Sequence, residues 1–186
     1  MYKTILRKYR KMRGMAKRPV MISDFQHSKN AQNDFVRVSS STFIDFPDNL
    51  KLGRNIFIGH HNFIEASQSI SIDEGCQITN FITITTHSTH KTIRLYGHNA
   101  EGADMVGYEK GPVKIGAFTF VGPHSTIMPN TTIGKGCVVA SHSYLQGDYP
   151  DFSIIAGVPA KVIGSVTDQD EELLQKYPHL RDTYMK

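Results

Sequence analysis

The chain has 186 residues, of which 39% are hydrophobic, and its 21 basic and 17 acidic residues give a net charge of +4. This length suits one domain with a real core, and no run of about 18 apolar residues could span a membrane. Two cysteines cannot form a disulfide framework. The basic start is not followed by the apolar core of a secretory signal, so we expect a cytoplasmic protein.

The basic residues are concentrated at the start of the chain. Eight of the 21 basic residues and none of the 17 acidic ones fall in residues 1–18, which leaves 13 basic and 17 acidic residues for the rest. Residues 1–19 are therefore predicted to form a basic arm that packs on the protein or makes weak contact with an anionic membrane surface. The acidic remainder predicts no nucleic-acid partner.

Residues 20–164 are predicted to form one all-β domain, because aliphatic residues recur in it at every sixth position. The first half of this frame contains two slips of two residues each, and a slip of two preserves the inward and outward alternation of a strand. Longer corners can therefore absorb both slips. The aliphatic positions before the first interruption are Val38, Ile44, Leu50, Leu52, Ile58, Ile64, Ile72, Ile78 and Ile84.

The frame stops after Thr89. Residues 90–112 are polar and contain four glycines and a proline, which predicts a loop that projects from the domain. A loop of this length in a compact domain usually has a function.

An unbroken block of repeats follows, from Val113 to Leu145. Six aliphatic residues are spaced six apart, and a small residue stands two places before each of the last five, on the same side of a strand. This pattern predicts a parallel β-helix of hexapeptide repeats with triangular coils. Cys76 and Cys137 occupy the small inward place and are predicted to be buried packing thiols. The aliphatic residues are Ile115, Val121, Ile127, Ile133, Val139 and Leu145.

The end of the chain carries a different pattern. Residues 152–164 are predicted to form a last pair of strands. Residues 165–186 are predicted to form a short helix and tail, with Thr167 as the N-cap and acidic residues in the first turn.

Three segments resemble the hexapeptide acyltransferases, which include maltose, galactoside, nodulation-factor and polysaccharide O-acetyltransferases. They are Gly-Pro-Val-Lys-Ile-Gly at 111–116, Pro-Asn-Thr-Thr-Ile-Gly at 129–134 and Ala-Gly-Val-Pro-Ala-Lys-Val-Ile-Gly at 156–164. The resemblance covers residues 50–164. It implies a left-handed helix, a homotrimer with active sites between subunits, and no required metal. It also implies acetyl transfer from acetyl-CoA to a hydroxyl of a sugar or polysaccharide precursor.

Several histidines lie at outward corners, and the resemblance selects one of them. His87 follows two threonines at the place where the family carries its catalytic base, and His90 is the second choice. A neutral imidazole can take the proton of a sugar hydroxyl as that hydroxyl attacks a thioester. Matching to the family places the acceptor near His61, Asn62 and His90.

The same matching places coenzyme A against a set of corner residues and one lysine. Relatives often carry Thr-Lys where this chain has Gln146-Gly147, so one phosphate contact is missing. The matched residues are Pro123, Ser141, Gln146, Gly147 and Lys161.

Three alternative functions remain open on the sequence. An amino-sugar N-acetyltransferase differs only in its acceptor. A zinc lyase of the γ-type carbonic anhydrase kind needs two histidines five residues apart, and no pair here has that spacing. A non-catalytic β-helix scaffold would need neither His87 nor the projecting loop.

Overall fold

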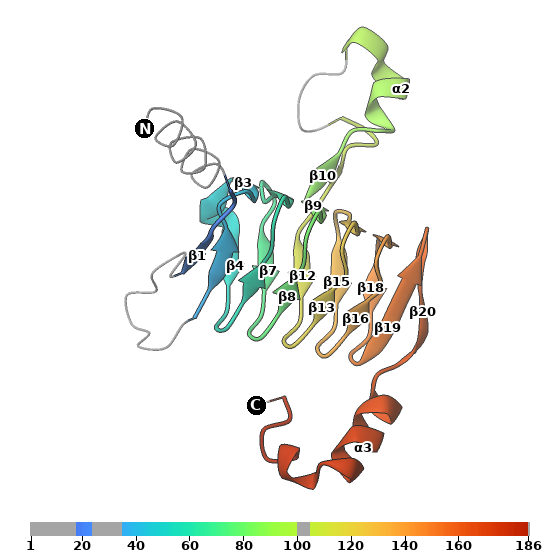
Figure 1. Cartoon of the computed structure of the whole chain (residues 1–186). Helices are drawn as coiled ribbons and strands as arrows, with labels where there is room; N and C mark the ends of the chain where they lie inside the picture. The colour runs from blue at the N-terminus through green and yellow to red at the C-terminus, as the bar shows by residue number, and fades with distance from the viewer. Residues whose placement is uncertain (1–17, 24–34, 100–104, 186) are drawn as a thin grey trace, which may run out of the picture.

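The protein is a β-solenoid of about six turns in the computed structural model, which describes residues 18–23, 35–99 and 105–185. The strands of the solenoid form three sheets, one on each face, and these sheets enclose the interior (Figure 1). Face A contains β1 (Met21–Ser23), β2 (Arg37–Ser39), β5 (Phe57–Ile58), β8 (Gln77–Ile78), β13 (Phe120–Val121), β16 (Val138–Val139), β19 (Ser153–Gly157) and β20 (Ala160–Ser165). Face B contains β3 (Phe43–Asp45), β6 (Phe63–Glu65), β9 (Thr83–Thr85), β14 (Thr126–Ile127) and β17 (Tyr144–Leu145). Face C contains β4 (Leu50–Leu52), β7 (Ile70–Ile72), β12 (Val113–Ile115), β15 (Thr131–Ile133) and β18 (Asp148–Tyr149).

The hexapeptide frame predicted from the sequence is confirmed by the register of these strands. On face A, Val38 pairs with Ile58, which pairs in turn with Ile78, and the same inward column continues to Val121 and Val139. The aliphatic side chains of these columns are buried in one core. Cys76 and Cys137 are buried in that core as predicted.

Both slips of the frame lie at the corner between faces B and C. The chain inserts η1 (Pro47–Asn49) before β4, and residues 66–69 separate β6 from β7. The coil of β14 and β15 passes the same corner with fewer residues, since only 128–130 separate these two strands. The extra residues are therefore absorbed in corners, and the inward columns stay aligned.

The corner between faces A and B carries a column of stacked rings. His61, Phe81, His124 and His142 all have positive φ angles, from 57° to 61°. Their rings are 5.1, 4.9 and 4.8 Å apart between successive centroids, and the last two pairs are parallel within 3°. The left-handed conformation costs about 1–2 kcal/mol for a residue with a side chain, and stacking of each ring pair stabilises the corner by about 0.5–1.5 kcal/mol. We call these four residues the ring ladder.

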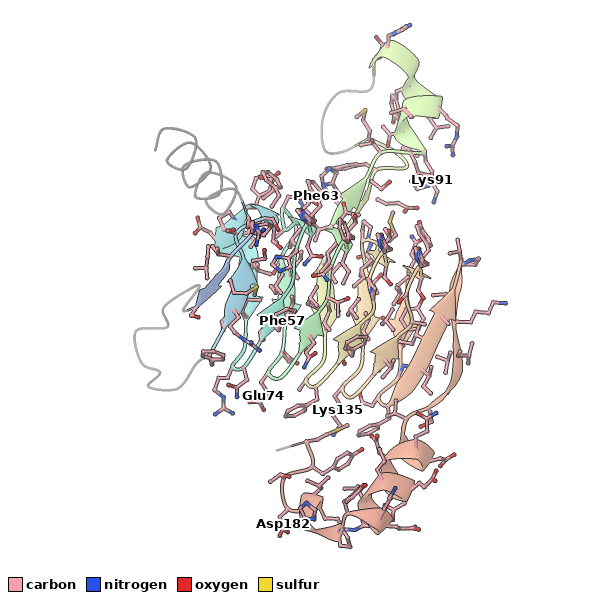
Figure 2. The ribbon with its side chains drawn as sticks, viewed as in Figure 1. Phe57, Phe63, Glu74, Lys91, Lys135 and Asp182 are labelled. Atoms are coloured by element: carbon pink, nitrogen blue, oxygen red, sulfur yellow. The ribbon has the colours of Figure 1, made fainter. Side chains whose placement is uncertain are left out.

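The segment predicted to project as a loop does leave the solenoid, but it has structure of its own. β10 (His87–Ser88) pairs antiparallel with β11 (Glu109–Lys110), and α2 (Thr92–Tyr96) and η2 (Gly97–Asn99) follow β10. This hairpin arm, residues 87–110 without the undescribed 100–104, rises from the corner between faces B and C (Figure 1). Lys91 lies at its base (Figure 2) and forms an ion pair with Glu109.

The chain ends in an antiparallel strand pair and a helix. β19 pairs with β20, and α3 (Thr167–Lys176) follows, with η3 (Pro178–Leu180) after it. The N-cap of α3 is Val166, so the prediction of Thr167 as N-cap is wrong by one residue. Apart from its last two residues, the predicted basic arm lies outside the described residues. No helix in the described part of the chain is long and apolar enough to cross a membrane.

Candidate active site

His87 stands where the chain leaves the regular coils. It is the first residue of β10, at the corner between faces B and C, and its side chain is 37% exposed. Its Nδ1 atom is 2.9 Å from Oε2 of Glu65 and 3.4 Å from Oγ of Ser67. The ring of Tyr108, from the returning side of the hairpin arm, is 5.9 Å away between centroids. The His87 ring is therefore held by the preceding coil through Glu65 and contacted by Tyr108 from the returning strand of its own hairpin.

The partner of His87 is a buried carboxylate. Glu65 ends β6, where it pairs in register with Thr85 of the next coil, and its side chain is 5% exposed. The backbone N–H and the hydroxyl of Thr86 both donate to Oε2 at 2.9 Å, and the backbone N–H of Ser67 donates to Oε1 at 2.8 Å. Burial alone would raise the pKa of Glu65, but the hydrogen bonds from Ser67 and Thr86 outweigh it and lower this pKa to about 2.

The charge of Glu65 determines the tautomer of a neutral His87. An ionised carboxylate only accepts hydrogen bonds, so the Nδ1 atom that contacts it must carry the hydrogen. The lone pair of the neutral ring is then on Nε2. No residue in the described ranges is hydrogen-bonded to Nε2. The geometry therefore presents a proton acceptor at a partly exposed corner, which is what general base catalysis requires.

The residues matched to coenzyme A lie mostly along the two edges of face B. Pro123 and Ser141 are at the corner between faces A and B, one coil apart, and Gln146 and Gly147 are at the corner between B and C. Gln146 also reaches the hairpin arm, since its Nε2 donates to Oε2 of Glu109 at 3.3 Å. Lys161 lies apart on β20, at the end of face A.

The residues matched to the acceptor have three different environments. His61 is exposed in the ring ladder, and His90 is exposed on the hairpin arm with its Nδ1 2.8 Å from Oγ of Ser88. Asn62 is only 2% exposed. Its amide nitrogen donates to the carbonyls of Gly59 and Thr79, and its amide oxygen accepts from the N–H of Ile82. Asn62 thus braces two coils, with its side chain buried between them.

Three comparisons with known proteins bear on this site. Residues 112–147 match the family model described as bacterial transferase hexapeptide (six repeats). A probable acetyltransferase of Mycobacterium tuberculosis is 33% identical over 122 residues, and the galactoside O-acetyltransferase of Escherichia coli is 27% identical over 136. A solved structure of a maltose O-acetyltransferase from Clostridium difficile superposes with a TM-score of 0.58 at 25% identity, covering 68% of this chain and 64% of that one.

The chain belongs to the hexapeptide-repeat acetyltransferase family. The aligned residues make up 63% of this chain and 36% of the mycobacterial relative. They make up 72% of this chain and 63% of the Escherichia coli enzyme.

Within this hexapeptide-repeat chain, Glu65 is the site residue that the sequence analysis missed. A signal for it was present in the six-residue frame. The frame places Ile64 beneath Ile84, so Glu65 falls one coil beneath Thr85 and next to the corner that carries His87. An acidic residue directly after an inward aliphatic residue, beneath a histidine corner, is the feature that could have identified it.

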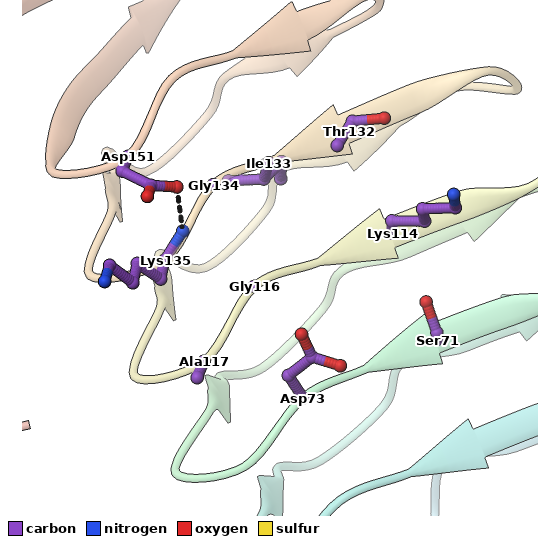
Figure 3. Close-up of a pocket in the computed structure, with 10 residues that line it drawn as sticks. All are labelled: Ser71, Asp73, Lys114, Gly116, Ala117, Thr132, Ile133, Gly134, Lys135 and Asp151. Atoms are coloured by element: carbon purple, nitrogen blue, oxygen red, sulfur yellow. Dashed lines mark hydrogen bonds between the residues drawn. The ribbon is translucent and has the colours of Figure 1, made fainter. Parts of the chain in front are cut away.

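A shallow groove of about 580 Å³ lies elsewhere on this family member, along the outer side of face C and its corner with face A (Figure 3). Ser71, Lys114 and Thr132 line it from three neighbouring strands. At the corner, the backbone N–H of Lys135 donates to Oδ1 of Asp151 at 2.9 Å. The groove includes neither His87 nor any of the residues matched to coenzyme A.

The described residues hold no group of three or more histidine, cysteine, aspartate or glutamate side chains arranged to bind a metal ion.

Proposed function

We propose that this protein transfers an acetyl group from acetyl-CoA to a hydroxyl of a sugar or polysaccharide precursor, with His87 as general base. The observation that carries this proposal is the partly exposed His87 ring, bonded through Nδ1 to a buried carboxylate, which leaves Nε2 without a hydrogen bond in the described ranges. Family membership supplies the reaction class, and the relatives named as galactoside and maltose O-acetyltransferases support a sugar hydroxyl as the acceptor.

The chemistry needs little beyond these groups. A sugar hydroxyl is a weak nucleophile, and proton transfer to a positioned imidazole contributes about 10²–10⁴ in rate. The tetrahedral oxyanion that forms on the thioester carbon needs a hydrogen-bond donor, for which backbone N–H groups of a neighbouring coil are suited.

For the donor, we propose that coenzyme A lies along face B. Pro123 and Ser141 mark one edge of that face, and Gln146 and Gly147 mark the other, on the same corner line as His87. Lys161 would contact a phosphate of the nucleotide end. The acceptor would approach from the hairpin arm, where His90 follows the base by three residues and the ring of Tyr108 lies 5.9 Å from the ring of His87.

We further propose a homotrimer. The outer sides of faces A and B carry large exposed apolar residues, while the outer side of face C is polar. The apolar set is Phe43, Phe63, Phe120 and Val138, with Phe57 and Tyr144 partly buried, and the polar set is Lys51, Ser71, Lys114, Thr132 and Asp148. Exposed aromatic surface of this extent is typical of a contact between proteins. Light scattering should give three times the chain mass of 20.9 kDa, and a stable monomer at micromolar concentration would refute the trimer.

The reaction itself is tested by release of free coenzyme A thiol from acetyl-CoA across a panel of sugars. Acceptors with hydroxyl groups only should support turnover, and the product should be an ester that mild alkali removes. Turnover confined to amino sugars, with an alkali-stable amide product, would replace the proposal by N-acetylation. No thiol release above hydrolysis with any acceptor, together with no saturable binding of coenzyme A, would favour a scaffold.

A further inference from the structure

Glu65 is buried although it lies next to a partly exposed corner. Its carboxylate accepts hydrogen bonds from the backbone of Ser67, from the backbone and hydroxyl of Thr86, and from the ring of His87, and a longer one of 3.5 Å from the hydroxyl of Thr85. Thr86 is itself fully buried, and its hydroxyl oxygen also accepts from the backbone N–H of Gln68 at 3.0 Å. Ser67, Thr85 and Thr86 therefore fix the carboxylate, and the carboxylate in turn contacts the ring of His87.

We propose that Glu65 is a positioning residue for acetyl transfer, which holds His87 in the tautomer with hydrogen on Nδ1 and stabilises the imidazolium that forms during the reaction. This inference rests on the proposed function of His87 as the base. Because Nδ1 donates its hydrogen to the carboxylate, the lone pair that can take a proton is on Nε2, in a side chain that is 37% exposed.

The step balances without any further reactant. The acceptor oxygen bonds to the carbonyl carbon of the thioester as its proton passes to Nε2 of His87. The tetrahedral intermediate then collapses, the carbon–sulfur bond breaks, and the same proton passes from Nε2 to the leaving sulfur. The products are an acetyl ester and the free thiol of coenzyme A. Through this cycle the imidazolium carries one positive charge 2.9 Å from the negative charge of Glu65, which favours the charged ring.

The geometry distinguishes Glu65 from the other charged groups near His87. Tyr108 faces the ring, but no hydrogen bond joins it to His87 in the described structure. Glu109 is bonded to Lys91 and Gln146 instead. Glu65 is thus the one carboxylate in the described ranges that contacts the ring.

Two measurements test the inference. Nitrogen-15 NMR of the wild-type protein, with the His87 signals identified by their loss in His87→Asn, should show a neutral ring protonated on Nδ1. Glu65→Gln should then show mixed tautomers, because a neutral amide can either accept from or donate to the ring. The variant should also lower kcat by about 10²–10⁴-fold with an unchanged KM for acetyl-CoA, while Glu172→Gln, an exposed glutamate of α3, should match the wild type.

The outcomes separate this inference from the proposed function. Hydrogen on Nε2 in the wild-type ring would overturn the inference even if Glu65→Gln fails to fold. A fully active Glu65→Gln beside an inactive His87→Asn would also overturn it and leave the acetyltransferase proposal standing. If the wild type transfers no acetyl group, the proposed function fails, and the tautomer of His87 still decides whether Glu65 positions the ring.

Discussion

The buried carboxylate of Glu65 should make the fold sensitive to acid, and the structure sets the size of the effect. Hydrogen bonds hold the pKa of this group at about 2, against 4.5 ordinarily. Each pH unit of that difference is worth about 1.4 kcal/mol, so the ionised group stabilises the folded state by about 3 kcal/mol. Because the folded pKa is the lower one, this stabilisation is complete above pH 4.5 and is lost as the pH falls towards 2.

The assay compares urea unfolding of the wild type and Glu65→Gln from pH 7 downward, at one protein concentration because assembly affects stability. The difference in unfolding free energy between the two should shrink as the pH falls, with more than half of the change reached by pH 3 and about 3 kcal/mol by pH 2. Glu172→Gln controls for the loss of one exposed negative charge. A difference between the wild type and Glu65→Gln that is constant from pH 7 to pH 3 would refute the buried, ionised state of Glu65.

Three further predictions follow from the packing and from the proposed donor site. Phe81→Ala removes two ring contacts of the ring ladder and should destabilise the fold by about 1–3 kcal/mol more than Phe46→Ala. Phe46 is a matched control, because both rings are 50% exposed with φ near 57° and Phe46 has no ring partner in the described structure. Equal losses in thermal unfolding would show that stacking does not stabilise the corner. Burial raises the pKa of Cys76 to about 12 and also raises the pKa of Cys137. Both thiols of the folded protein should therefore resist a disulfide reagent at pH 8 that labels the unfolded chain at once, and rapid labelling of the folded protein would contradict their burial. Lys161→Ala should raise the KM for acetyl-CoA about tenfold or more with little change in kcat, and an unchanged KM would leave Lys161 a surface charge.

The regular part of the fold could be predicted because one constraint repeats. Every coil must place aliphatic side chains in a narrow interior, so the spacing of residues such as Ile58, Ile78 and Val121 indicates the six-residue period directly. The same constraint locates the slips, because the six-residue spacing of aliphatic residues resumes two residues later after each of them. The helix near the C-terminus could be predicted from its acidic first turn, which is a local signal.

The site could be predicted only in part, because it depends on which corners lie above one another. His87 has the same place in its hexad as His61, His124 and His142, yet those three stack in the ring ladder and His87 lies at the next corner. The difference comes from the face on which each hexad lies. The strands and helix of the hairpin arm were also not predicted, because the polar residues of 90–112 follow no period.

The central claim is that Nε2 of His87 accepts the proton of the acceptor hydroxyl. The direct measurement is kcat for thiol release by His87→Asn beside His90→Asn, with acetyl-CoA binding measured for both. The account predicts that His87→Asn lowers kcat by about 10²–10⁴-fold and still binds acetyl-CoA, while His90→Asn loses far less activity. Near-normal turnover by His87→Asn would contradict the account.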